Sequence, residues 1–321
     1  MNLFISVVSH NHHHIIESLD SLRRLAGNNN ISVICRDNIP SDICQGYCAA
    51  NNIYYHPNAK IKGFSANNNA NYLYAKQHLG MTPDDYFILM NPDVLIDQRN
   101  IKKLINILCK HQPDLAAPSL YLDDKHQTYD DNLRKYPKLK NFAKNYILRD
   151  RSTVIDKKTE EPESLDYWAS ASFLCVRSRV YDSLEGFDET YHMYCEDVDF
   201  CSRALQLGHK PRFMRSVKAA HFRRRYSQKF LSRAFFWHVK SVFLYSLAQH
   251  NLRQHKSLLK SAPLLYKSVK PNTATAHIAT PHIARSRIAK PRIATPHIAK
   301  PHIAKPHTDV PIAIEVSHKL S

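Results

Sequence analysis

Asp93 is the first residue of this 321-residue chain whose type and position indicate chemistry. It follows the hydrophobic run Tyr86–Met90 (YFILM) through the short turn Asn91-Pro92. Ligands of open α/β sheets bind where such strands end, and carboxylate oxygens suit Mg²⁺ or Mn²⁺ on a diphosphate. An Asp that only terminates a strand has the same local sequence, so the tripeptide leaves both interpretations open.

Three carboxylates stand close together further along the chain, at Glu196, Asp197 and Asp199. They lie at the start of an expected helix, where the helix dipole stabilises negative charge without any catalytic role. Carboxylates at this spacing also repel one another, which can raise the pKa of one of them toward the range of a general base. The residues alone are consistent with both explanations.

A histidine and a run of arginines follow at 221–225 (HFRRR). Such a run can neutralise a leaving diphosphate, or it can form an ordinary solvated surface. Nearby aromatic side chains fit either a sugar site or a hydrophobic core; they are Trp168, Phe187, Tyr191 and Tyr194.

Short hydrophobic runs alternate with helical patterns through the first hundred residues. We expect strands at 3–9, 31–35, 53–56 and 86–90, and helices at 15–25, 41–51 and 69–78. This succession with short loops is typical of a doubly wound α/β sheet, whose strand ends would place Asp93 at the ligand-binding edge.

The second half of the chain is less regular. Residues 125–163 are polar and predict no clear element, whereas 168–176 are again apolar. Further helices are expected at 180–184, 197–207 and 230–250.

The C-terminal segment has a different composition. From His277 it repeats every five residues with frequent prolines, which exclude a helix interior and a sheet ladder. We therefore predict one domain over 1–265, with a nucleotide-binding half at 1–120 and an acceptor-side half at 121–265. A disordered, basic, extended tail would follow at 266–321.

Composition excludes several classes of protein. Hydrophobic residues form 43% of the chain and there are only 6 glycines, which argues against wholesale disorder and collagen-like repeats. The seven cysteines include no CxxC pair and indicate reduced thiols. Neither a signal peptide nor a run of about 18–20 apolar residues is present, so we expect a cytoplasmic protein.

The formal net charge of +17 is concentrated toward the C-terminus. Residues 1–200 carry 22 Lys/Arg and 26 Asp/Glu, whereas residues 201–251 carry 11 and none. This asymmetry predicts an anionic partner, such as a membrane surface. Nucleic acid is not the expected partner, because the basic repeats hold no aromatic residues to stack on bases.

Several motifs in their order along the chain resemble one enzyme family. They are VVSHN, CRDN, GFSANNNAN, ILMNPDV, GFDETYHMYCEDVDFCSRALQLG and AAHFRRRYS. Over about residues 1–250 the chain resembles the inverting family 2 glycosyltransferases with the GT-A fold. Within them it looks most like the bacterial rhamnosyltransferases of O-antigen and other polysaccharide assembly. The resemblance implies a mostly parallel central sheet flanked by helices, followed by C-terminal helices and the tail.

The resemblance also implies roles for single residues. It places a nucleotide-binding group at the ends of the first strands and around the expected metal, namely Ser9, His10, Asp37, Gly63, Asn69, Asn91 and Asp93. Asp93 would hold Mg²⁺ or Mn²⁺ together with His221. The acceptor side would be formed by Trp168, Ala169 and Ser170.

Catalytic roles follow from the same resemblance. Glu196-Asp197 matches the family's ED motif, in which the Asp is the base. His221, Arg223 and Arg225 would lie near the diphosphate. Asn67 and Asn71 stand where the family often has Gly, so they depart from the family's pattern.

The activity implied is an inverting sugar transfer from a nucleoside-diphosphate donor, dTDP-rhamnose by subgroup, to a lipid-linked or lipopolysaccharide glycan. The alternatives are a UDP-hexose or UDP-N-acetylhexosamine donor, or a non-catalytic basic protein that binds nucleic acid or membrane. With such an acceptor, the protein would attach peripherally to the inner face of the cytoplasmic membrane.

Overall fold

The computed structural model describes residues 1–138, 141–142, 150–223 and 233–260. The expected tail at 266–321, the domain boundary at 265 and the diphosphate candidate Arg225 lie outside these residues.

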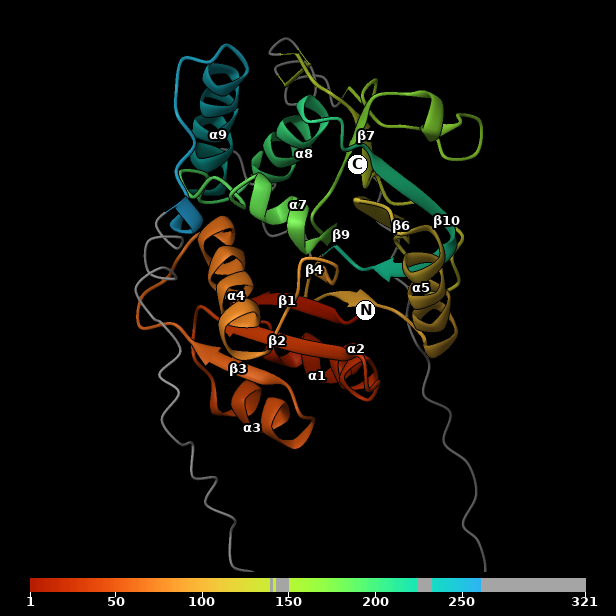
Figure 1. Cartoon of the computed structure of the whole chain (residues 1–321), viewed down its shortest axis with the longest axis vertical. Helices are drawn as coiled ribbons and strands as arrows, with labels where there is room; N and C mark the ends of the chain where they lie inside the picture. The colour runs from red at the N-terminus through yellow and green to blue at the C-terminus, as the bar shows by residue number, and fades with distance from the viewer. Residues whose placement is uncertain (139–140, 143–149, 224–232, 261–321) are drawn as a thin grey trace, which may run out of the picture. The chain divides into compact units, whose positions relative to one another are not determined.

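An eight-stranded sheet forms the centre of the fold, in the order β3-β2-β1-β4-β9-β6-β10-β5 (Figure 1). The strands are β1 (Leu3–Ser9), β2 (Ile31–Asp37), β3 (Tyr54–Pro57), β4 (Tyr86–Met90), β5 (Val94–Leu95), β6 (Leu115–Tyr121), β9 (Phe173–Arg177) and β10 (Pro211–His221). Only β9 and β5 run antiparallel to their neighbours. The expected α/β class with a mostly parallel sheet is confirmed.

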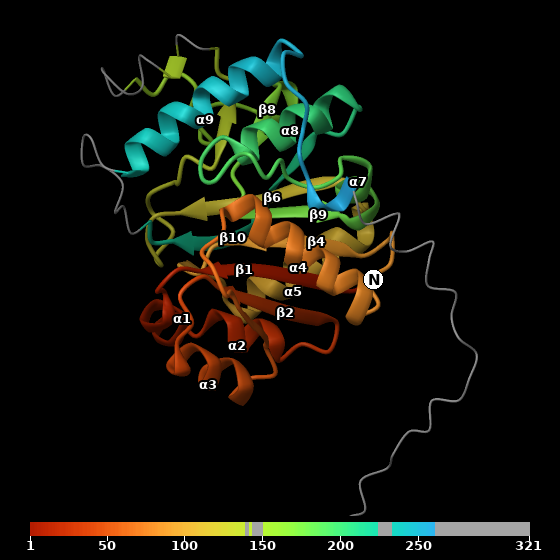
Figure 2. The same cartoon turned by 90° about the vertical axis from the view of Figure 1, so that its left-hand side faces the viewer.

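Helices cover both faces of this sheet (Figure 2). The helices are α1 (His13–Leu19), α2 (Ser21–Ala26), α3 (Asp42–Ala50), α4 (Phe64–His78), α5 (Gln98–His111), α7 (Ser178–Ser183), α8 (Glu196–Gln206) and α9 (Arg233–Gln249). Alternate side chains of β1 lie on opposite faces of the sheet. Leu3 and Ile5 pack with α1, α2, α3 and α5, whereas Phe4 packs with α4, α7 and α8. The sheet is therefore buried on both sides, as its continuous hydrophobic strands predict.

Two predicted helices differ from the structure. The run expected at 15–25 is broken at Asp20, whose φ of 54° is left-handed and separates α1 from α2. The helix expected at 69–78 begins five residues earlier, at Phe64, directly after its N-cap Gly63. Asn67, Asn68, Asn69 and Asn71 of α4 are all buried, so hydrophobic periodicity could not locate the start of this helix.

A second, smaller sheet lies partly in the stretch 125–163 that predicted no clear element. A two-stranded sheet pairs β7 (Leu133–Lys135) with β8 (Tyr167–Ala169), with Arg134 opposite Trp168. A short 3-10 helix lies at Pro162–Ser164 and another at Leu258–Lys260. None of the described helices has both the length and the apolar character needed to cross a membrane.

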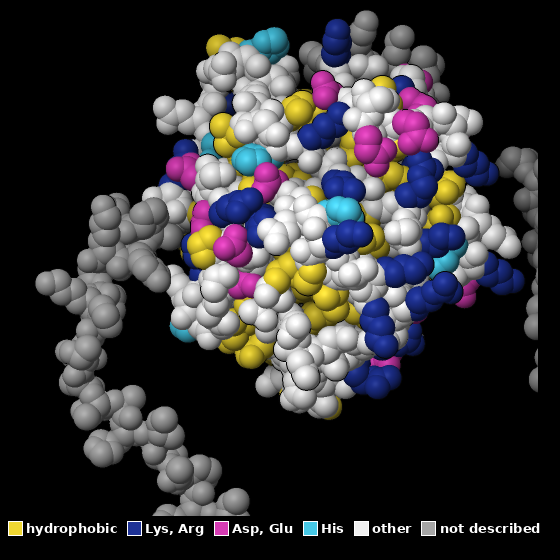
Figure 3. Space-filling view, turned by 45° about the vertical axis from the view of Figure 1, so that its right-hand side comes forward, with side chains coloured by type: hydrophobic (Ala, Val, Ile, Leu, Met, Phe, Trp, Pro, Cys, Tyr) yellow, Lys and Arg dark blue, Asp and Glu magenta, His cyan; other side chains and the backbone are white. Residues whose placement is uncertain are grey.

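Basic side chains gather on the side of the domain that carries α5 and β10 (Figure 3). Arg99 and Lys102 of α5 are exposed, as are Arg212 and Arg215 of β10. The positive stretch that begins at residue 201 therefore contributes to one face of the domain rather than to the sheet's interior.

Candidate active site

The end of β4 lies beside the end of β10. The short strand β5 pairs with β10, with Val94 opposite His221, and this pairing brings the ring of His221 to the turn after β4. The ring atom Nε2 lies 3.4 Å from Oδ1 of Asp93 and 3.3 Å from Nδ2 of Asn91. Two segments that are far apart in the sequence, the turn with Asn91 and Asp93 and the end of β10 with His221, thus meet at one point.

His221 is held from behind by Asp130, a buried residue that motif reasoning did not select. Nδ1 of His221 lies 2.6 Å from Oδ2 of Asp130, whose other oxygen pairs with Arg223. Burial would lower the pKa of His221, but the hydrogen bonds to Asp130 and Asp93 outweigh it and raise the pKa to about 9. The contact with Asp130 fixes which ring nitrogen faces Asp93.

This donor set fits a divalent cation. Asp93 supplies a carboxylate, Asn91 an amide, and His221 a ring nitrogen that can bind a metal once it gives up its proton, on a ring that a second carboxylate orients. A histidine backed by a carboxylate is a common arrangement at metal sites. Mg²⁺ and Mn²⁺ take few protein ligands and fill the remaining positions with water and phosphate oxygens. One acidic ligand is therefore compatible with such an ion.

Glu196 and Asp197 form the first turn of α8. The two residues before them, Tyr194 and Cys195, both have left-handed φ angles of 72° and 62°. Non-glycine residues adopt this conformation at a cost, and such strain concentrates at functional sites. The sharp turn directs the start of α8 toward the loop between β8 and β9.

Asp197 is half-buried and is oriented by backbone N–H groups. Val198 N donates to its Oδ1 at 2.9 Å, and Ala171 N donates to its Oδ2 at 3.4 Å. Burial raises the pKa of Asp197, and these backbone donors oppose the rise only in part. An oriented carboxylate with a raised pKa has the properties of a general base.

Its two acidic neighbours are placed differently. Glu196 is buried, its Oε2 has no hydrogen-bond partner, and burial together with the charge of Asp197 raises its pKa well above the usual range. Asp199 is buried too, but it pairs with Arg203 at 2.9 Å and accepts a hydrogen bond from Tyr191. The contacts of Asp199 therefore fit a structural role, whereas those of Glu196 and Asp197 do not.

The β8–β9 loop connects the two halves of the site. Asn91 N donates to the carbonyl oxygen of Ser172 at 2.9 Å, and the preceding residue, Ala171, contacts Asp197. Ser170 N donates to Asn132 O, and the indole Nε1 of half-buried Trp168 is enclosed without a partner. The loop expected on the acceptor side is thus in direct contact with both Asn91 and Asp197.

Arg134 is a second functional candidate that motif reasoning did not select. It lies on β7 opposite Trp168 and donates to the backbone of Asp131. Burial lowers its pKa, while Asp131 and Asp197 are close enough to raise it in part. The signal in the sequence was the acidic pair Asp130-Asp131 followed closely by an arginine, in a stretch where no element was predicted.

The edge expected to bind the nucleotide consists of the ends of β1 and β2. Ser9 and Asp37 are register partners there, and both are buried. Asp37 accepts a hydrogen bond from Tyr55 OH at 3.1 Å, and burial raises its pKa despite that bond and one from Ser9. His10 follows Ser9 and is exposed. The structure therefore brings Ser9 and Asp37 together and leaves His10 at the surface.

Asn69 lies apart from this edge. It is fully buried, and its amide nitrogen donates to the backbone of Phe187 at 2.9 Å and to Glu189 at 2.8 Å. Its oxygen accepts from Tyr181 OH and from the Phe187 backbone. All of these partners are protein groups, so Asn69 anchors the loop after Gly186.

Gly63 is placed where no side chain fits. It precedes α4, and a Cβ added to it would lie 2.7 Å from the backbone oxygen and 2.8 Å from the Cα of His192. The next residue, Phe64, donates its N–H to the same His192 oxygen at 2.9 Å. The start of α4 thus depends on the close approach of its backbone at Gly63 to the backbone of His192.

Replacing Gly63 with Ala should lower the free energy of unfolding by about 1–3 kcal/mol, because the His192 segment must move to avoid the new methyl group. Gly46→Ala is the matched control: Gly46 lies within α3 and has no atom within 4 Å of an added Cβ. That change should stabilise by about 0.5–1 kcal/mol. Urea unfolding of both variants measures the difference, and equal effects would contradict the close approach.

No family model matches the chain. The rhamnosyltransferase WbbL of Escherichia coli (strain K12) is 31% identical over 248 residues, which cover 76% of this chain and 92% of that protein. The chain belongs to the rhamnosyltransferase-type glycosyltransferases. The family resemblance that the motifs indicated is therefore confirmed, and the chain is an enzyme of the glycosyltransferase class.

More distant relatives of this glycosyltransferase match over shorter stretches. An N-acetylglucosaminyl-diphospho-decaprenol L-rhamnosyltransferase of Mycobacterium tuberculosis is 26% identical over 175 residues, covering 52% of this chain and 57% of that protein. The low-salt glycan biosynthesis hexosyltransferase Agl10 of Haloferax volcanii is 23% identical, covering 63% of this chain and 61% of that protein.

Solved structures with a similar arrangement include a mannosyltransferase of Pyrobaculum calidifontis in complex with GDP-Man and Mn²⁺. It has a TM-score of 0.49 and 12% identity, covering 83% of this glycosyltransferase and 68% of that chain. TarS of S. aureus in complex with UDP-GlcNAc has a TM-score of 0.49 and 14% identity, covering 77% and 67%.

Proposed function

We propose that this glycosyltransferase moves a rhamnosyl group, with inversion, from dTDP-rhamnose to a lipid-linked or lipopolysaccharide glycan. One observation carries the proposal: the β8–β9 loop contacts Asp197 and Asn91 through two consecutive residues, Ala171 and Ser172, and Asn91 lies two residues before Asp93. A single displacement requires a base for the acceptor proton close to the site that holds the leaving diphosphate. The similarity to WbbL supports rhamnose as the sugar.

Asp197 would receive the proton of the acceptor hydroxyl. As the acceptor oxygen forms its bond to the anomeric carbon, the bond from that carbon to the diphosphate breaks, and the proton passes to Asp197. Two backbone N–H groups keep the carboxylate oriented. Its raised pKa makes it a stronger base than an exposed Asp, and such bases contribute about 10²–10⁴-fold to a rate.

The negative charge that develops on the leaving diphosphate would be offset on the other side of the loop. Asp93 and His221 would hold a divalent cation, which supplies electrostatic stabilisation of the departing phosphate oxygens. Arg223 lies beside Asp130 and Asp131, at the back of His221. Ser9 and Asp37 would bind the nucleoside at the neighbouring strand ends, where Asp37 is suited to accept a hydrogen bond from the base.

A panel of donors tests this function. The purified chain would be given dTDP-rhamnose, UDP-hexoses and UDP-N-acetylhexosamines with Mn²⁺ and a lipid-diphosphate sugar acceptor. We expect release of dTDP and a product of inverted anomeric configuration. Turnover with a UDP sugar and none with dTDP-rhamnose would show that the donor is the UDP sugar. No turnover with any donor would favour a non-catalytic binding role.

A lipid-linked acceptor would lie at a membrane, and one face of α9 is suited to attach there. Its inner face is held by buried Tyr245 and by Ser241, which donates to Met193 O. Its outer face exposes Phe236, Val239 and Phe243 by 58%, 51% and 63%, at helical spacing. Large exposed apolar side chains on one helix face are typical of interfacial attachment, and basic residues strengthen attachment to anionic lipid by about 1 kcal/mol each. We propose peripheral membrane attachment through this face.

Vesicle flotation tests that attachment. The protein should float with phosphatidylglycerol-containing vesicles, less so in high salt and less with neutral vesicles. Phe243→Ser should weaken flotation several-fold, whereas Leu207→Ser, at a 56% exposed position outside α9, should not. Equal flotation of the two variants would argue against α9, and a preference for DNA over anionic vesicles would favour the nucleic-acid alternative.

A further inference from the structure

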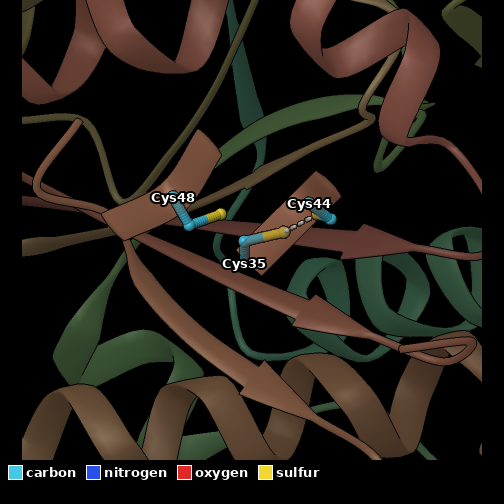
Figure 4. A group of neighbouring side chains, drawn as sticks. All are labelled: Cys35, Cys44 and Cys48. Atoms are coloured by element: carbon cyan, nitrogen blue, oxygen red, sulfur yellow. Dashed lines mark hydrogen bonds between the residues drawn. The ribbon is translucent and has the colours of Figure 1, made fainter. Parts of the chain in front are cut away.

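Three buried cysteines converge between β2 and α3, in a place that the transfer mechanism does not use. Cys35 lies on β2, and Cys44 and Cys48 lie four residues apart on α3, with exposures of 0%, 1% and 0%. Residues at this spacing share one face of a helix. Figure 4 shows the three sulfur atoms directed into the same space between strand and helix.

The distances among these thiols match a metal site. All three sulfur atoms lie within 4.8 Å of one another, and those of Cys35 and Cys44 are 4.0 Å apart. With metal–sulfur bonds of about 2.3 Å, three sulfurs in a plane around one ion lie about 4.0 Å apart. The backbone therefore already holds the sulfurs near the separation that three-coordinate binding requires.

The three side chains meet through their sulfur atoms. Three small thiols packed as hydrophobic residues would not need their sulfurs to meet.

We propose that Cys35, Cys44 and Cys48 form a binding site for a soft, thiophilic d¹⁰ cation such as Zn²⁺ or Cu⁺. Thiolates select these ions over Mg²⁺ and Mn²⁺, so the site is chemically separate from the one at Asp93. The ion would tie α3 to β2 two residues before Asp37. The thiol of Cys44 is also a neighbour of the Asp37 carboxylate.

Titration of the reduced, full-length protein with Cd²⁺, Zn²⁺ or Cu⁺ alone tests the site. Cd²⁺ bound to thiolates gives an ultraviolet charge-transfer band, and we expect it to saturate at one equivalent. Zn²⁺ or Cu⁺ should compete for the same equivalent and raise the thermal unfolding midpoint. Competition by Zn²⁺ would identify a divalent occupant, and competition by Cu⁺ alone a monovalent one.

Variants keep the test independent of transferase activity. Cys44→Ser and, separately, Cys48→Ala should weaken Cd²⁺ binding at least tenfold, while Cys175→Ala, at a buried cysteine outside the group, should not. Circular dichroism checks that each variant is folded. Absence of the charge-transfer band in the folded wild type, equal binding by Cys44→Ser, or a disulfide between these cysteines would overturn the proposal. Loss of the proposed glycosyl transfer would leave this result unchanged.

Discussion

Asp197→Asn should lower turnover by about 10²–10⁴-fold and leave donor affinity nearly unchanged. The amide cannot accept a proton, yet it is the same size and can still accept the N–H groups of Val198 and Ala171. Nucleoside diphosphate release at saturating donor and acceptor gives the turnover. Calorimetry with donor alone gives the affinity.

The neighbouring carboxylates are matched controls for Asp197. Glu196→Gln should be milder, because burial already favours the neutral form of Glu196 and Gln resembles that form. Asp199→Asn should weaken the contact with Arg203 and lower the free energy of unfolding by about 1–3 kcal/mol, while the folded fraction keeps its turnover within a few-fold. If Asp199→Asn instead removes turnover and Asp197→Asn keeps it, the base has been assigned to the wrong residue.

Asp93→Asn should remove the metal dependence of nucleotide binding. A neutral amide is a poor ligand for a hard dication, so affinity for dTDP in Mn²⁺ should fall to the value that wild type shows in a chelator. His221 would lose one of the two carboxylates that it contacts but keep Asp130, so the fold should survive. Calorimetric titration of dTDP with and without Mn²⁺ measures the effect.

Asp124→Asn is the control for this change, since Asp124 is exposed and the substitution alters the net charge equally. Its nucleotide affinity should match that of wild type in both conditions. An Asp93→Asn variant that still binds dTDP more tightly with Mn²⁺ than without it would remove Asp93 from the metal site.

The local sequence was sufficient to predict an element where the residue pattern is compatible with only one structure. The runs at β1, β2 and β4 are hydrophobic on both faces, and only a strand covered on both sides buries them. The predicted strands there agree with the structure to within two residues. The pattern failed for the first half of α4, where the buried positions include asparagines that bond to Ser6, Asn38 and the Phe187 backbone instead of packing as a hydrophobic stripe.

The sequence alone determined the enzyme family, the α/β class and the two carboxylate motifs, because these depend on residue type and spacing along the chain. The tertiary structure decided which residues meet: Asp130 behind His221, Arg134 near Asp197, and three cysteines around one point. These partners are separated in sequence by up to 91 residues in the case of Asp130 and His221. Strand pairing and helix packing alone bring such residues together, and neither leaves a periodic signal in the chain.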